Sequence, residues 1–226
     1  NSRTNDNEIE AGRGFWPGLC VSVKHSCKFA SFTMLAKGAY PAEMINPFPF
    51  ALISNDEVHG ELHVMPAFFW LHNMFAMARN NWKYATRDTR VFKVQNIEFD
   101  AYAPDSMEEA IEARKLLDKW TAKAWLLKQG KSLEGMTDEQ LIDMGRGLLN
   151  GDPAKIKDLE VLGEGMEKSR RKVIILHPYE AYHAYGYMLI YYSVRNIVSY
   201  LEEHEDETFQ GISKMFDGDR ARVWFN

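Results

Sequence analysis

Cysteine, long apolar segments and excess positive charge are all scarce in this sequence. Its 226 residues contain two cysteines, Cys20 and Cys27, which are too few for a disulfide scaffold and fit a reducing compartment. The net charge of −5 excludes the basic surface that nucleic acids and anionic membranes attract. No apolar run reaches the roughly 20 residues that cross a bilayer, because the best candidate is interrupted by His72 and Asn73. We therefore expect a cytoplasmic protein that binds neither nucleic acid nor membrane.

Apolar residues, in contrast, are plentiful, and at 46% of the chain they suffice for a real core. The sequence begins in a polar stretch without Met or a signal peptide, and it ends in an apolar cluster at residues 223–226. A natural terminus seldom leaves such a cluster exposed. We expect a globular fragment of a longer protein.

A spacing of six residues recurs in the first forty positions. Two series share it: Ile9, Phe15, Val21, Cys27 and Thr33, and Pro17, Val23, Phe29 and Leu35. Neither an α-helix nor a simple alternating strand repeats at six, whereas a hexapeptide repeat places one short strand and one corner in each repeat. The spacing predicts short parallel strands in stacked coils over residues 12–38. The alternative is an irregular, glycine-rich hairpin region.

Helices are expected to dominate the rest of the chain. Prolines interrupt residues 39–66, which we interpret as a cap and linker. Apolar side chains on every side of 67–84 predict a buried central helix, and 91–99 reads as an extended strand. Capping signals and periodicity predict further helices over 106–129, 137–150 and 178–204. The predicted fold is α+β: terminal coils of a parallel β-helix (1–38), a capping segment (39–66) and an α-helical domain (67–226).

Several longer strings resemble an uncharacterised bacterial family of long hexapeptide-repeat proteins. They are GRGFWPGLC at 12–20, FASF at 29–32 and LAKGAYPAE at 35–43, with shorter matches up to residue 88. The resemblance implies a left-handed β-helix of the kind found in sugar-nucleotide acyltransferases. Some members carry the label UDP-N-acetylglucosamine pyrophosphorylase. That label is a fold-level analogy, because left-handed β-helices also occur in non-catalytic scaffolds, and the resemblance carries over no catalytic residue.

The candidate chemical groups lie in the repeat region. Hexapeptide acyltransferases resemble one another in using a coil histidine as a general base, which makes His25 the candidate catalytic residue. Arg13, Lys24, Lys28 and Lys37 add positive charge nearby and are the candidate anion-binding residues for a nucleotide sugar or acyl-coenzyme A. The alternatives are a corner histidine in contact with solvent or a neighbouring subunit, and ordinary charged surface.

Two further groups lie in the helical part. His72, Asn73 and Arg79 are polar groups on or beside the apolar helix, and they predict either a ligand pocket or a satisfied structural network. Glu180 and His183 form one Glu-x-x-His motif, whereas a di-metal bundle needs two. Tyrosines flank this motif, so we interpret it as a packing surface and predict no metal ligands.

Two functions are consistent with these observations. The first is a transferase that acts on nucleotide sugars, by acyl or nucleotidyl transfer. The second is a non-catalytic scaffold whose helical tail is an oligomerisation or partner-binding module. In either case we expect a homo-oligomer, a trimer before a dimer, because truncated coils expose strand edges and left-handed β-helices commonly trimerise.

Overall fold

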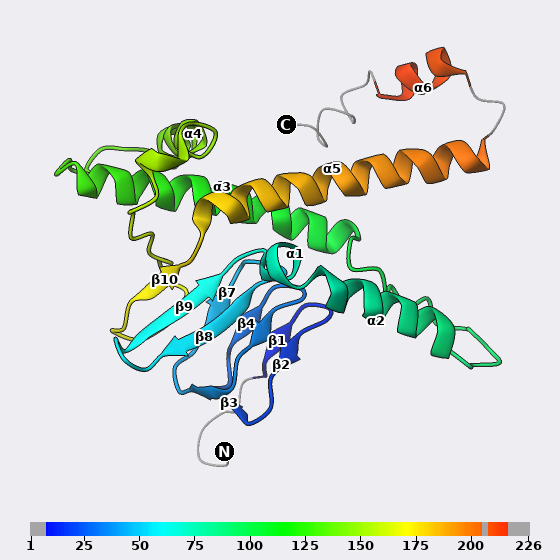
Figure 1. The fold of residues 1–226 in the computed structure, drawn as a ribbon, viewed down its shortest axis with the longest axis horizontal. Coiled ribbons are helices and arrows are strands. Elements are labelled where there is room, and N and C mark those ends of the chain that lie inside the picture. The colour runs from blue at the N-terminus through cyan, green and yellow to red at the C-terminus, as the bar shows by residue number, and fades with distance from the viewer. Residues whose placement is uncertain (1–7, 205–207, 217–226) are drawn as a thin grey trace. The chain divides into compact units, whose positions relative to one another are not determined.

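The computed structural model describes residues 8–204 and 208–216. It divides into two compact units, residues 1–189 and 190–226, which are described separately. The first unit holds all the strands and most of the helices (Figure 1). The second contains the C-terminal part of one long helix and one short helix. The apolar cluster at 223–226 lies outside the described residues.

Short strands form three small sheets that are mostly parallel. The first sheet contains β1 (Glu10–Ala11), β4 (Lys28–Phe29) and β7 (Ile45–Asn46). The second has the order β10-β9-β8-β5-β2, with bounds Val173–Ile175, Glu61–Met65, Leu52–Asp56, Met34–Leu35 and Trp16–Pro17. The third pairs β3 (Val21–Val23) with β6 (Gly38–Tyr40).

The prediction of a left-handed parallel β-helix is wrong, because the fold is α/β with three small sheets and six helices. The short parallel strands expected over 12–38 are present. The parallel strands from β1 to β8 pair at a separation of 17 or 18 residues, as in Glu10 opposite Lys28 and Val21 opposite Gly38. The six-residue spacing therefore separates strands of different sheets. The second sheet adds an antiparallel hairpin, β8–β9, and takes β10 from the segment predicted to be helical. A six-residue spacing near the start of the chain gives no information on pairing with a strand as distant in sequence as β10.

The helices occupy much of the remaining chain. Their bounds are α1 (Phe68–His72), α2 (Met74–Arg87), α3 (Pro104–Lys128), α4 (Asp138–Leu149), α5 (Pro178–Glu203) and α6 (Phe209–Phe216), with a 3-10 turn at Pro153–Lys155. The predictions of helices over 106–129, 137–150 and 178–204 are confirmed within about two residues. No helix in residues 8–204 or 208–216 is long and apolar enough to span a membrane.

Hydrogen bonds connect the sheets to the helices of the first unit. The hydroxyl of Tyr185 in α5 donates to the Pro49 carbonyl at 2.7 Å and accepts from the Ala67 amide at 3.1 Å. Burial raises the pKa of this hydroxyl well above its ordinary value, so it stays protonated and able to donate. The buried amide of Asn46 donates to Thr33 at 2.8 Å, which satisfies two polar groups inside the strand region.

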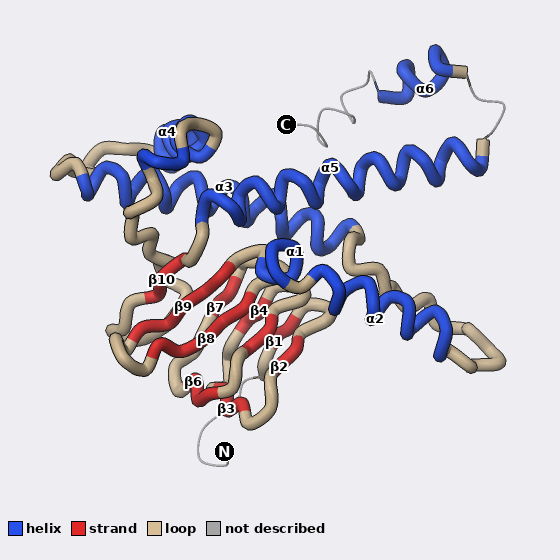
Figure 2. The backbone as a smooth tube through the Cα atoms, viewed as in Figure 1, coloured by secondary structure: helices blue, strands red, loops and turns tan. Residues whose placement is uncertain are grey.

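The prediction of one buried central helix over 67–84 is wrong. The segment forms two helices that meet at Asn73, and of their residues only Phe69 and Met77 are buried. Phe75 and Trp82 are 76% and 62% exposed. The expected strand over 91–99 is a loop, which Figure 2 shows between α2 and α3. Apolar residues on every side of a helix predict burial, but they do not show whether the same chain or another one covers the helix.

Candidate functional site

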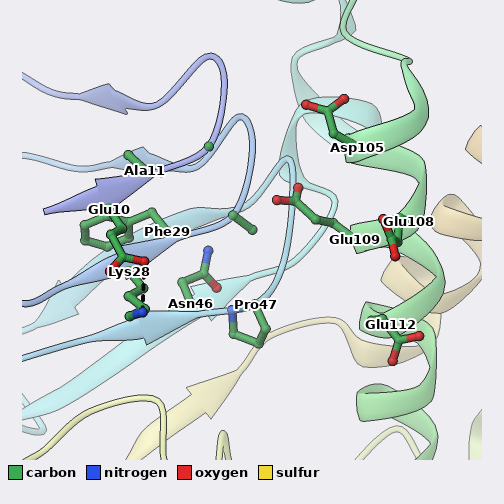
Figure 3. Close-up of a pocket in the computed structure, with 12 residues that line it drawn as sticks. Glu10, Ala11, Lys28, Phe29, Asn46, Pro47, Asp105, Glu108, Glu109 and Glu112 are labelled. Carbon is green, nitrogen blue, oxygen red and sulfur yellow. Dashed lines mark ion pairs between the residues drawn. The ribbon is translucent and has the colours of Figure 1, made fainter.

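A cleft of about 630 Å³ lies between the first sheet and the N-terminal half of α3 (Figure 3). The strands contribute a mixed wall of charged, apolar and amide side chains, and α3 contributes carboxylates. The lining residues with a bearing on its chemistry are Glu10, Lys28, Phe29, Asn46, Asp105, Glu108, Glu109 and Glu112. We call this the acidic cleft.

Helical geometry explains the row of carboxylates along α3. Glu108 and Glu109 each lie three or four residues from Asp105 and from Glu112, which places all four carboxylates on one broad face of a helix. The helix begins at Pro104, and its N-terminal partial positive charge favours acidic residues in the first turn. The result is a negatively charged strip that faces the strands.

Two contacts fix this strip against the strands. The Arg13 guanidinium donates two hydrogen bonds to the Asp105 carboxylate, at 2.6 and 2.7 Å, and this contact lowers the pKa of Asp105. The Glu109 carboxylate accepts from the Ser31 amide at 2.9 Å. Burial raises the pKa of Glu109 despite that hydrogen bond.

Carboxylates are the main charged groups that line the cleft. Among its described lining residues Lys28 is the single cation, and its ammonium group pairs with Glu10 at 2.8 Å. Glu108 and Glu112 are exposed residues on α3, and the Glu112 carboxylate pairs with Lys115 at 2.6 Å. A negatively charged, solvent-accessible cleft attracts positive charge on a binding partner.

The four predicted anion-binding residues have different neighbours. Arg13 and Lys28 are paired with the carboxylates of the acidic-cleft region. The Lys24 ammonium lies 3.1 Å from a ring nitrogen of His25, and Lys37 is exposed just before β6. The ion pairs of Arg13 and Lys28 therefore neutralise two of the charges that a phosphate group would need.

The imidazole of His25 is partly buried between its sequence neighbours. Its Nε2 faces Lys24, and its Nδ1 lies 3.2 Å from the Ser26 hydroxyl. A general base must present an unprotonated nitrogen to the acceptor. Both ring nitrogens here have a polar neighbour, and His25 does not line the acidic cleft. Its catalytic role stays a prediction.

The predicted pocket residues lie around the junction of α1 and α2. The ring of His72 is 5.7 Å from that of Phe68 and 6.4 Å from that of His177. Asn73 joins the two helices, and Arg79 is exposed on α2. None of the three predicted residues lines the acidic cleft. A ligand pocket at this junction stays a prediction.

A second surface combines apolar and basic side chains. It consists of α2 and residues 88–99, which we call the α2 arm. Exposed apolar side chains of the arm are Met74, Phe75, Trp82, Val91, Phe92, Val94, Ile97 and Phe99. The helix also contains Arg79, Lys83 and Arg87 and no acidic residue. Burial, followed by repulsion from Arg79 and Arg87, lowers the pKa of Lys83.

Contacts within the arm hold its loop against its helix. The ring of Phe99 stacks on that of Tyr84 at a centroid distance of 4.5 Å. Arg90 donates to the Asp88 carboxylate at 2.7 Å and to the Tyr84 hydroxyl at 3.0 Å. The exposed apolar residues are therefore presented by a structured element.

Sequence reasoning missed the acidic strip, because it interpreted residues 106–109 only as a helix cap. The available signal was the spacing of Asp105, Glu108, Glu109 and Glu112, which matches one helical face. It also missed the exposure of the α2 arm. The exposure of the arm depends on which other parts of the chain pack against α2.

Comparisons with known proteins add one relative. No family model matches the sequence, and no solved structure matches it. A curated protein of Treponema pallidum (strain Nichols), named "Uncharacterized protein", is 41% identical over 203 residues. The matched region is 90% of this chain and 27% of that protein, so the chain spans about a quarter of its relative's length. The comparison names no hexapeptide-repeat family and no activity.

Proposed function

We propose that this chain is an assembly module in which the α2 arm of one copy binds the acidic cleft of another. The observation that carries the proposal is the exposure of large apolar residues on a structured, basic element. Phe92 and Val94 are 84% and 90% exposed, in addition to the two aromatic residues of α2 described above. Contiguous exposed apolar surface of this kind is typical of interaction sites.

Burial of the arm would supply binding energy. Covering a large apolar side chain contributes about 1.5–3 kcal/mol, and aromatic residues frequently dominate binding at interfaces. Phe75, Trp82 and Phe92 are therefore the expected anchors. The basic residues of α2 would lie at the rim of the contact, where they affect partner choice and association rate.

Charge complementarity favours a second copy as the partner. The α2 helix carries Arg79, Lys83 and Arg87 without an acid. The acidic strip of α3 carries four carboxylates, of which Asp105 pairs with Arg13 and Glu112 with Lys115. One chain thus contains both halves of a complementary pair. The contact joins two different surfaces, so its geometry decides between a closed ring, a reciprocal dimer and an open filament.

The transferase function receives less support from the geometry. A nucleotide sugar or acyl-coenzyme A carries phosphate groups, which need several cations directed at one place. Arg13 and Lys28 already pair with carboxylates.

Sedimentation equilibrium of the 226-residue chain tests the assembly. We expect an oligomer at tens of micromolar, and we expect the double variant Phe75→Ser/Trp82→Ser to weaken association at least tenfold. Leu127→Ser is the matched control, because it removes an exposed apolar residue from another helix and should leave association unchanged. A monomeric wild-type chain, or equal association by both variants, would contradict the proposal.

A charge exchange tests the identity of the partner surface. Glu108→Lys/Glu112→Lys should weaken association, and so should Arg79→Glu/Lys83→Glu. Mixing the two variants should restore it, because the opposite charges then face each other across the contact. If each variant associates more weakly and the mixture associates no better than either variant alone, the arm binds a surface other than the acidic cleft.

A further inference from the structure

The β8–β9 hairpin brings together side chains that commonly bind metal ions. Asp56, His59, Glu61 and His63 occur within eight residues at the hairpin turn. The strand register pairs Asp56 with Glu61 and Ser54 with His63. Side chains directly opposite each other, and those two residues apart on one strand, share a face of a sheet. The carboxylates of Asp56 and Glu61 and the imidazole of His63 therefore project from the same face.

Their donor atoms are spaced as metal ligands. The Nε2 atom of His63 lies 3.5 Å from Glu61 Oε2 and 3.6 Å from Asp56 Oδ2. The three atoms lie within 4.8 Å of one another. The two measured separations exceed the usual hydrogen-bond range of about 2.7–3.2 Å. They are close to the roughly 3.4 Å between ligand atoms that surround a tetrahedral zinc ion at about 2.0–2.1 Å.

We propose that Asp56, Glu61 and His63 bind a divalent transition-metal ion, with Zn²⁺ as the best match. One imidazole nitrogen and two carboxylate oxygens suit zinc, whereas calcium and magnesium prefer sites made of oxygen alone. Three protein ligands leave at least one coordination position for water or another ligand. The three side chains are only about one-fifth exposed, so most of each is held by the surrounding protein.

His59 holds the Asp56 carboxylate in place. Its Nδ1 atom lies 2.8 Å from Asp56 Oδ2. The other oxygen, Oδ1, accepts from the backbone amides of Val58 and His59 at 3.0 and 3.2 Å. Such hydrogen bonds orient a ligating carboxylate, and their loss commonly weakens metal binding tenfold to a hundredfold, to order of magnitude. We assign His59 as a positioning residue.

The neighbouring strands support this geometry. β9 is paired on both sides, by β8 and by β10, and Ile174 of β10 lies opposite His63. Two cations directly precede β10, and each pairs with a carboxylate outside the proposed site. Arg171 pairs with Glu167 at 2.5 Å, and Lys172 pairs with Glu160 at 2.7 Å. Neither Arg171 nor Lys172 is therefore paired with Asp56 or Glu61, and the close side-chain contact of Asp56 besides the proposed ligands is with His59.

Titration calorimetry of the tag-free chain with zinc sulfate tests the site. We expect one ion per chain with a micromolar dissociation constant, and a tetrahedral absorption spectrum when Co²⁺ replaces Zn²⁺. His63→Gln and Asp56→Asn should each reduce affinity at least tenfold. His59→Ala should reduce it about tenfold, because His59 orients Asp56 without being a direct ligand. The matched control is His204→Ala, an exposed histidine outside the hairpin, and it should bind like the wild type.

Circular dichroism of every variant, and zinc-dependent thermal stabilisation, separate metal binding from folding. Zinc should raise the melting temperature of the wild type but not of folded His63→Gln. The absence of binding at 100 micromolar zinc, or full affinity in folded His63→Gln, would overturn the proposal. Association of the chain measured with a chelator present reports on the assembly module separately, so the two proposals can fail independently.

Discussion

Replacing Gly145 with alanine is expected to force α3 and α4 apart and to lower the free energy of unfolding by about 3 kcal/mol or more. A Cβ atom at this position would lie 1.8 Å from the Asp118 carbonyl oxygen and 2.4 Å from its carbonyl carbon. Both atoms belong to the backbone, so no side-chain rotation relieves the overlap. The separation would also disturb the apolar cluster in which Ala122 and Leu126 of α3 meet Leu141 of α4.

Gly147→Ala provides a matched control on the same helix. A Cβ atom at Gly147 meets nothing within 4 Å. Alanine is favoured over glycine inside a helix by about 1 kcal/mol, so this change should stabilise the protein slightly. Urea unfolding followed by circular dichroism measures both variants. Similar free energies for Gly145→Ala and Gly147→Ala would show that α3 and α4 do not approach each other in this way.

The second large effect concerns pH and the carboxyl group of Asp118, which is 2% exposed. Burial raises its pKa to about 7, although Arg146 and Arg114 act in the opposite direction. Its Oδ1 atom has no hydrogen-bond partner in the described structure. The unfolded chain releases the proton near pH 4, whereas the folded chain keeps it until about pH 7. This group therefore makes the protein less stable as pH rises from about 4 to 7, by up to about 4 kcal/mol.

Asp118→Asn should remove most of this pH dependence, because asparagine has a similar shape and no ionisable group. We expect it to be more stable than the wild type at pH 8 by a few kcal/mol and nearly equal at pH 4. Urea unfolding at several pH values measures the difference. Asp158→Asn, an exposed change, should follow the wild-type profile. A wild-type stability that rises between pH 4 and 7 in parallel with the Asp118→Asn variant would contradict the assignment.

Local signals in the sequence determined several helices. Thr137 and Gln140 illustrate this: the Thr137 hydroxyl accepts from the Gln140 amide at 3.3 Å, and the Gln140 side chain accepts from the Thr137 amide at 3.0 Å. Both partners lie within one helical turn, so their spacing alone predicts the helix start. Short strands over 12–38 were predictable for a similar reason, since apolar spacing and glycine positions are also local.

Tertiary structure alone decided which strands pair and where the two proposed sites form. The acidic cleft requires strands between residues 10 and 46 to lie against α3, and the exposed apolar side chains of the α2 arm are those that the packing of the first unit leaves uncovered. The hairpin residues Asp56, Glu61 and His63 are close in sequence, yet sequence reasoning did not select them. Only the register of β8 against β9 places their donor atoms together on one face. The acidic cleft and the exposure of the arm depend on contacts between distant segments, and the hairpin site depends on strand register. Local sequence patterns predict neither.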